Sequence, residues 1–326
     1  MRLLKKIFTT SLATGTLICG GAAQAAWPDD QPITIVVPFA AGGVTDQMAR
    51  LMSKELSKSL NQSVIVQNRS GAGGLLGART TAQAPADGYT LFLSQIASHG
   101  SLPALHKDLG YDPIKSYTPV VLLTAHPNVL VKNPKVSVKN IAELITMAKD
   151  KPGELNYASA GIGTTFFLSA ELLKTLADVS ITGIHYKGGA PAVMATLSGE
   201  TDFVFSDFAT AVMHVKNGTL DALGVTSKDR SPALPDVPAV AETPGLEDFE
   251  IVSWISLHYP AGVPDAIVRR VNEAANQALK SKEISQWLAN SGGTAKGGTP
   301  EDLSRHVGVE LEKWARVIQR AGIEQQ

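Results

Sequence analysis

The pattern that most constrains the fold is a buried strand that ends in a glycine loop and passes directly into an amphipathic helix. Residues 33–37 are an unbroken, mostly β-branched apolar run, typical of a strand covered on both faces of a parallel sheet. A Pro-Phe-Ala-Ala-Gly-Gly loop follows at 38–43, and apolar residues then recur on one helical face between Met48 and Leu56. Repeated along a chain, such junctions predict a doubly wound α/β fold.

The pattern recurs in two blocks, which predicts two α/β domains. The other strand-like segments are 64–66, 89–93, 120–123, 129–131, 155–158, 182–186, 202–205 and 251–259. Helical patterns lie between most of them, and three helices close the chain, beginning at 264, 283 and 300. We expect the segments near 120–131 and 251–259 to cross between the domains as a double hinge. The expected domains are 26–124 with 254–326, and 125–253.

The first 25 residues have the pattern of a signal peptide. Three cations near the start precede a short apolar stretch at 7–19, and Ala23-Gln24-Ala25 is an A-x-A cleavage motif. The stretch is too short and too interrupted to span a bilayer comfortably, although an uncleaved anchor is the alternative. We therefore expect export to the periplasm with cleavage after Ala25, which would also remove Cys19, the one cysteine.

Composition and motifs argue against several classes of protein. A net charge of -1 without a basic cluster does not suit a protein that holds nucleic acid. A single cysteine excludes a disulfide framework, and the seven histidines show no metal-like spacing. The glycines of 71–77 miss the dinucleotide-binding spacing, and Ser159 lacks a nucleophile-elbow pattern. We expect no catalytic residue, no metal and no cofactor.

Two strand-to-helix junctions have the residues of an anion site. Gly42-Gly43-Val44-Thr45-Asp46 and Gly161-Ile162-Gly163-Thr164-Thr165 both place glycines and hydroxyl residues where a helix begins. The first helical N–H groups are unpaired there, and glycine allows a ligand to approach the backbone. The alternative is that Thr45 or Asp46 and Thr164 simply cap their own helices.

Several motifs, in order, resemble one known family. Residues 36–46 resemble the PF-x-x-GG-x-x-D opening of the Bug family, the periplasmic solute receptors of tripartite tricarboxylate transporters. The resemblance covers essentially the whole chain after the signal peptide, through 68–74, 86–91, 111–113, 186–188, 234–238 and 241–242. It implies a type II periplasmic binding protein, in which two α/β domains enclose a ligand cleft.

The resemblance also implies which residues bind the ligand. Two opposed loops would hold a carboxylate through backbone N–H groups, hydroxyls and water, with Asp46 as an acceptor that orients water or loop amides. Further residues would form side walls that contact the rest of the ligand. The implied residues are Phe39, Ala40, Gly43 and Asp46; Ser159, Gly163 and Thr164; and Ser94, Gln95, Ser98, His99 and Asp207.

Two departures from the family pattern leave the distal part of the ligand open. Many relatives have a histidine where Phe167 stands, and an Asp-Asn pair where Ser206-Asp207 stands. The expected function is capture of a small carboxylate-bearing organic solute by hinge closure, for uptake or sensing. The expected partners are membrane components of a tripartite tricarboxylate transporter or a sensor protein, with the receptor itself a monomer.

A different class remains as the alternative, namely a hydrolase or isomerase on the same two-domain scaffold. Such an enzyme needs a perturbed titratable group within reach of its substrate. The loops offer only Asp46, His99 and Asp207 for that role.

Overall fold

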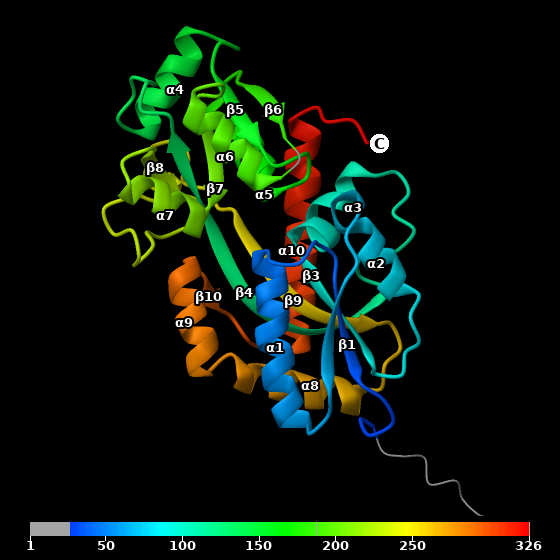
Figure 1. Ribbon diagram of the computed structural model, residues 1–326. Helices are drawn as coiled ribbons and strands as arrows, with labels where there is room; N and C mark the ends of the chain where they lie inside the picture. Colours follow the sequence, from blue (N-terminus) through cyan, green and yellow to red (C-terminus); the bar gives the residue numbers. More distant parts are fainter. Residues whose placement is uncertain (1–26, 187, 326) are drawn as a thin grey trace, which may run out of the picture.

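One long strand, β4 (Tyr117–Lys132), connects two lobes of an α/β fold (Figure 1). The computed structural model describes residues 27–186 and 188–325, so the expected signal peptide and its cleavage site lie outside the described residues. In Figure 1 the lower lobe contains α1, α2 and α8, and the green upper lobe contains α4 to α7. No helix within the described ranges is both long and apolar enough to cross a membrane.

The lower lobe is built on a parallel strand trio extended by antiparallel strands. β1 lies between β2 and β3, and β9 continues the sheet by pairing antiparallel with both β3 and β4. The short β10 pairs with β4. The strands are β1 (Ile33–Val37), β2 (Val64–Asn68), β3 (Thr90–Gln95), β9 (Val252–Pro260) and β10 (Thr294–Ala295).

The upper lobe repeats the arrangement around the second half of β4. β5 pairs in parallel with β6 and β7, and β4 pairs antiparallel with β7 and β8. The strands are β5 (Asn156–Ser159), β6 (Thr182–His185), β7 (Phe203–Asp207) and β8 (Asp221–Val225). The predicted α/β fold with two wound units is therefore confirmed.

Helices cover both sheets. Those of the lower lobe are α1 (Val44–Leu60), α2 (Leu75–Ala82), α3 (Leu102–Leu105), α8 (Asp265–Ala278) and α9 (Lys282–Ser291). Those of the upper lobe are α4 (Ile141–Asp150), α5 (Thr165–Ala177), α6 (Gly189–Ser198) and α7 (Phe208–Lys216). Irregular turns are η1 (Ala72–Gly74), the π-helical η2 (Ala97–Ser101) and η3 (Val240–Glu242).

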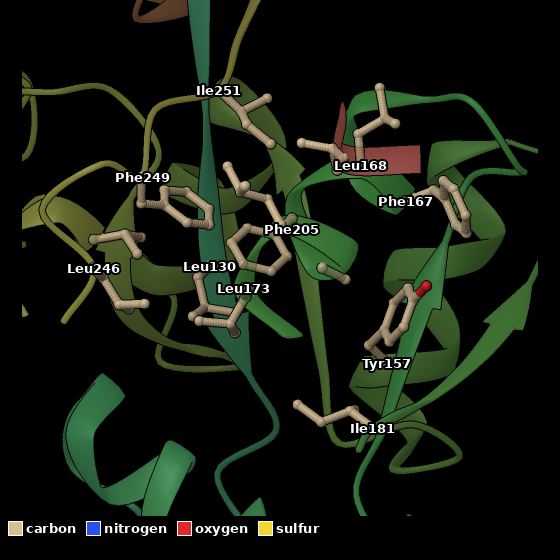
Figure 2. Close-up of a cluster of buried hydrophobic side chains, with 14 of the residues drawn as sticks. Leu130, Tyr157, Phe167, Leu168, Leu173, Ile181, Phe205, Leu246, Phe249 and Ile251 are labelled. Atoms are coloured by element: carbon tan, nitrogen blue, oxygen red, sulfur yellow. The ribbon is translucent and has the colours of Figure 1, made fainter. Parts of the chain in front are cut away.

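The last helix, α10 (Pro300–Arg320), packs against both lobes. It contacts β4, η2 and α3, and it also contacts α5 of the upper lobe. Its Trp314 and Val317 belong to the same hydrophobic cluster as Trp254 of β9 and the upper-lobe core. Figure 2 shows part of that core, where Phe205 and Phe249 lie together with Leu130 of β4. One apolar core therefore joins the two lobes on the α10 side.

The structure corrects the predicted elements in one place and adds to them in others. The strands expected at 120–123 and 129–131 are one continuous strand. Pro127 lies at the end of its pairing with β9, just before β4 begins to pair with β7, and a strand tolerates a missing N–H there. The short elements η2, α3, α7 and β8 were not predicted, because each is too brief or too exposed to show a clear period.

Candidate functional site

The loop between β1 and α1 is organised by the carboxylate of Asp46. Its two oxygens accept hydrogen bonds from the backbone N of Gly42 at 2.9 Å, from Asn68 Nδ2 at 2.9 Å, and from both Arg50 Nε and Nη2. Burial opposes the charge of Asp46, but these hydrogen bonds outweigh burial and hold its pKa below the usual value. Asp46 is thus an anion that accepts hydrogen bonds from within the protein, one of them from the loop amide of Gly42.

The first turn of α1 has no side-chain cap. Gly43 is the N-cap residue, its backbone is extended, and no side chain bonds the first helical N–H groups. Gly43 is exposed, and a Cβ placed on it would have no atom within 4 Å. The alternative that Thr45 or Asp46 caps this helix is therefore wrong. A 17-residue helix begins here with its positive dipole end open to solvent.

Phe39 and Ala40 form the remainder of this loop. The carbonyl oxygen of Phe39 accepts a second hydrogen bond from Asn68 Nδ2, at 3.0 Å, and its ring lies against Gly74. Ala40 is exposed. Asn68, at the end of β2, therefore connects the loop backbone to Asp46 and holds the loop in shape.

The loop between β5 and α5 is closed by its own side chains. Ser159 Oγ lies 2.7 Å from His185 Nδ1 and accepts from the backbone N of Gly161. Thr164 caps α5, accepting from the N of Phe167 at 3.5 Å, and donates to the O of Gly161 at 2.6 Å. The ordinary-cap interpretation therefore holds for Thr164, and this junction is less open than the one at Gly43.

Gly163 brings the upper lobe against the lower one. Its carbonyl accepts a hydrogen bond from Ser101 Oγ of η2 at 3.0 Å. Its backbone has φ +82°, and a Cβ would lie 3.0 Å from Leu105. Gly163 is therefore required by the backbone conformation and by packing, whatever its role toward a ligand.

A third strand-to-helix junction, which the sequence analysis did not identify as part of the site, lies at the start of α6. Gly188 is the N-cap residue with φ +122°, no side chain caps the helix, and a Cβ on Gly188 would meet nothing within 4 Å. The next residue, Gly189, lies close to Asp207, with its Cβ position 3.6 Å from Oδ2. The signal was present in the sequence, because Lys187-Gly188-Gly189 follows a strand as the other glycine loops do.

Asp207 ends β7 and begins α7. Solvent reaches its side chain, yet protein atoms surround it closely, and the resulting desolvation raises its pKa to about 6. Although it occupies the N-cap position, its side chain does not cap α7. A carboxylate with a raised pKa is a candidate functional group.

Helix α9 links the first loop to the start of α7. Trp287 Nε1 donates to Gln47 Oε1 at 2.8 Å, and Gln47 Nε2 donates to the carbonyl of Gly42 at 2.9 Å. At the end of the same helix, the ring of Phe208 covers Gly292. The β1–α1 and β7–α7 junctions therefore lie against the same helix, from opposite lobes.

The residues predicted as walls after β3 lie in the interior instead. Ser94 Oγ bonds Ser256 Oγ at 2.6 Å and His258 Nδ1 at 2.8 Å, and Ser98 Oγ bonds the carbonyl of Gln95 at 3.2 Å. Ser94, Ser98 and His99 are all fully buried, while Gln95 is partly buried. Ser98 and His99 lie in the π-helical turn η2, which packs against α10.

His99 is the clearest example of a predicted wall residue that lies in the interior. Its ring lies 4.7 Å from that of Tyr117 and 4.4 Å from that of His258, centroid to centroid. Burial lowers its pKa to about 3, so the imidazole is neutral. The structure does not bring His99 to the glycine loops, and the sequence could not show this because it depends on the packing of α10.

The Ser159–His185 pair bears on the hydrolase alternative. Ser159 is buried, and the atom of His185 that it contacts is Nδ1. Within residues 27–186 and 188–325, no carboxylate hydrogen-bonds His185. The carboxylate whose charge acts on His185 is that of Glu171, and it accepts hydrogen bonds from Tyr157 and Lys174. The pair braces its loop and lacks the orienting acid of a catalytic triad. The same described ranges contain no cluster of His, Cys, Asp or Glu able to hold a metal ion.

The chain is similar in sequence and in structure to a family of receptors. Residues 48–323 match the family described as "Tripartite tricarboxylate transporter family receptor". R. palustris Rpa4515, solved with adipate, is 35% identical with a TM-score of 0.82, covering 92% of this chain and 100% of that one. MatC from Rhodopseudomonas palustris, solved with bound malate, is 34% identical with a TM-score of 0.78, covering 89% and 99%. The periplasmic binding protein BugD is 31% identical with a TM-score of 0.77, covering 91% and 99%.

Proposed function

The chain belongs to the tripartite tricarboxylate transporter receptor family, and from that premise we propose that it captures a small carboxylate-bearing solute between its two lobes. The resemblance noted in the sequence is thereby confirmed, and the family consists of binding receptors. The proposal adds the chemical class of the ligand, the residues that hold it and the manner of capture.

The observation that supports this ligand class most strongly is the open start of α1. Gly43 leaves the first helical N–H groups uncapped, and the neighbouring cation Arg50 is bonded to Asp46. A carboxylate at this position would receive several neutral donors and the positive end of a helix dipole. Hydrogen bonds to a charged group contribute about 1.5–3 kcal/mol each, so a few of them reach micromolar affinity after the cost of closure.

The ligands of the relatives support the same class. Rpa4515 was solved with adipate and MatC with malate, and both molecules are small organic acids. We propose that the ligand carboxylate lies at Gly43, with Phe39 and Ala40 beside it and Asp46 holding the loop. Ser159, Gly163 and Thr164 shape the facing loop, and Asp207 lies toward the far end of the ligand.

We propose that the lobes move as the bodies 26–124 with 254–326, and 125–253, about β4 and β9. These strands pair with each other between the lobes, and α10 packs against β4 and accepts a hydrogen bond from Trp254 of β9 through Glu310. The receptor would act as a monomer in the periplasm after cleavage following Ala25. It would deliver its ligand to membrane components of a tripartite transporter or to a sensor protein.

Native mass spectrometry of protein purified from the periplasm tests the ligand class directly. The expected result is a small acid retained by the protein. When that acid is added at 100 times its dissociation constant, it should raise the free energy of unfolding by about 2.7 kcal/mol, which a thermal shift detects. Amidation of its carboxylate should remove the shift. Equal stabilisation by acid and amide would contradict the proposal, and chemical turnover of the bound ligand would favour the enzyme alternative.

A further inference from the structure

The far end of the proposed site contains a carboxylate that does not serve the helix it begins. Asp207 is the N-cap residue of α7, where an aspartate normally accepts from the first helical N–H groups. No such hydrogen bond forms, and Oδ2 instead lies near Gly189 at the start of α6. Within the described parts of the chain, no side chain donates to this carboxylate.

A second unused acceptor lies directly across the sheet. Asn128 of β4 is paired with Asp207 in the β4–β7 register. Directly opposed residues of an antiparallel pair place their Cβ atoms about 5 Å apart. Asn128 is 1% exposed, and its backbone N and O are both bonded to Thr226. Its side-chain Oδ1 nevertheless has no hydrogen-bond partner, which is uncommon for a buried polar atom.

The residues that the structure describes supply no donor to the carboxylate of Asp207 or to Asn128 Oδ1, and two such acceptors favour a ligand group that donates hydrogen bonds. An ammonium has enough N–H donors to satisfy both acceptors, and a hydroxyl donates to one of them. A second ligand carboxylate would instead add further acceptors and a like charge beside Asp207. Asn128 Oδ1 is the buried member of the pair, and a ligand that leaves a buried polar atom unpaired is disfavoured relative to one that donates to it.

We infer that Asp207 and Asn128 select ligands that present a hydroxyl or ammonium group at the end away from the carboxylate held at Gly43. This inference rests on the proposed function and narrows its ligand class. Preferred ligands are hydroxy or amino carboxylates, and plain dicarboxylates of the same length bind more weakly. The two residues are specificity determinants, since the first carboxylate is held elsewhere.

Isothermal titration with chain-length-matched probes tests this inference. The probes are glutarate, 5-hydroxypentanoate and 5-aminopentanoate, with succinate, 4-hydroxybutyrate and 4-aminobutyrate as a shorter set. In the unaltered mature protein, the better of the hydroxy and amino acids should bind at least about tenfold more tightly than the diacid of the same length. In Asp207→Asn, which keeps the shape and supplies a donor, this ratio should fall to about one or invert.

Two further variants serve as controls. Asp229→Asn alters an exposed acid on a surface turn of the upper lobe and should leave the ratio unchanged. Lys187→Ala tests the alternative that the cation before Gly188 sets the ratio. A ratio that collapses in Lys187→Ala but not in Asp207→Asn would assign the selectivity to a cation and overturn the inference.

The outcomes separate this inference from the proposed function. Binding of the plain diacids as tightly as the hydroxy and amino acids, with the same ratio in Asp207→Asn, would overturn the inference alone. Failure of all six probes and of the mono-, di- and tricarboxylates to bind would contradict the proposed function, and the inference with it.

Discussion

Glycines that look alike in the sequence have different physical roles in this protein. Gly43 has φ -74°, a conformation open to any residue, and faces open space. Gly163 has φ +82° and lies against Leu105, so the turn itself requires glycine. Both were predicted to serve ligand binding, and their backbone angles and surroundings distinguish them. The separation between a binding glycine and a structural one therefore depends on conformation, which residue type alone does not specify.

Gly43→Val should abolish ligand-induced stabilisation while the ligand-free protein still unfolds cooperatively. The valine side chain should obstruct the approach of a carboxylate to the first N–H groups of α1, while its Cβ would meet no atom of the protein within 4 Å. Thermal unfolding with and without a bound carboxylate measures both effects.

Gly308→Val provides the matched control for this variant. Gly308 lies on α10, away from the loops, and a Cβ there also meets nothing within 4 Å. It should retain the full ligand-induced shift. A Gly43→Val protein that fails to fold, or one that binds as the unaltered protein does, would remove Gly43 from the site.

At the scale of secondary structure, the local elements were predictable and the long-range ones were not. β1 and the start of α1 follow from a short apolar run, a glycine pair and a helical period. The continuity of β4 depends on partners contributed by both lobes, and a local pattern interrupted by Pro127 cannot show it. The burial of His99 likewise depends on η2 packing beneath a helix more than 200 residues later in the chain.

Three buried histidines, one in η2 and two on the crossing strands, predict how stability depends on pH. Burial lowers the pKa of His99 to about 3 and that of His126 to about 4, and it also lowers the pKa of His258. Below about pH 6.5 the unfolded chain binds protons that these folded histidines exclude, so stability falls as pH decreases. The raised pKa of Asp207 has the opposite effect, because it makes stability increase as pH falls from about 6 to 4. This one group opposes the three histidines.

Thermal unfolding at pH 7.5 and pH 5.0 should therefore show a lower melting temperature at pH 5.0, and His99→Gln should reduce that difference. His214→Gln, on the surface helix α7, is the control and should leave the difference unchanged. A melting temperature that is the same at both pH values would contradict the burial of this cluster as the structure describes it.

At the scale of the whole molecule, the site depends on junctions contributed by both lobes. α9 contacts the first loop through Gln47 and the start of α7 through Phe208, so elements distant in sequence meet at one place. The sequence predicts Gly43, Asp46 and Asp207 as site residues from loop composition and family resemblance. It could not reveal Asn128, whose significance lies in an unsatisfied atom visible only in three dimensions.

The central claim is that backbone N–H groups at an uncapped helix start hold the ligand carboxylate. The most direct measurement is a ¹⁵N–¹H correlation spectrum of glycine-labelled protein, with the Gly43, Gly188 and Gly308 resonances assigned from single alanine variants. On saturation with a bound carboxylate, the Gly43 amide should shift downfield, as expected for an N–H that gains a charged acceptor, while Gly308 should not move. Saturable binding that leaves the Gly43 amide unchanged would contradict the account.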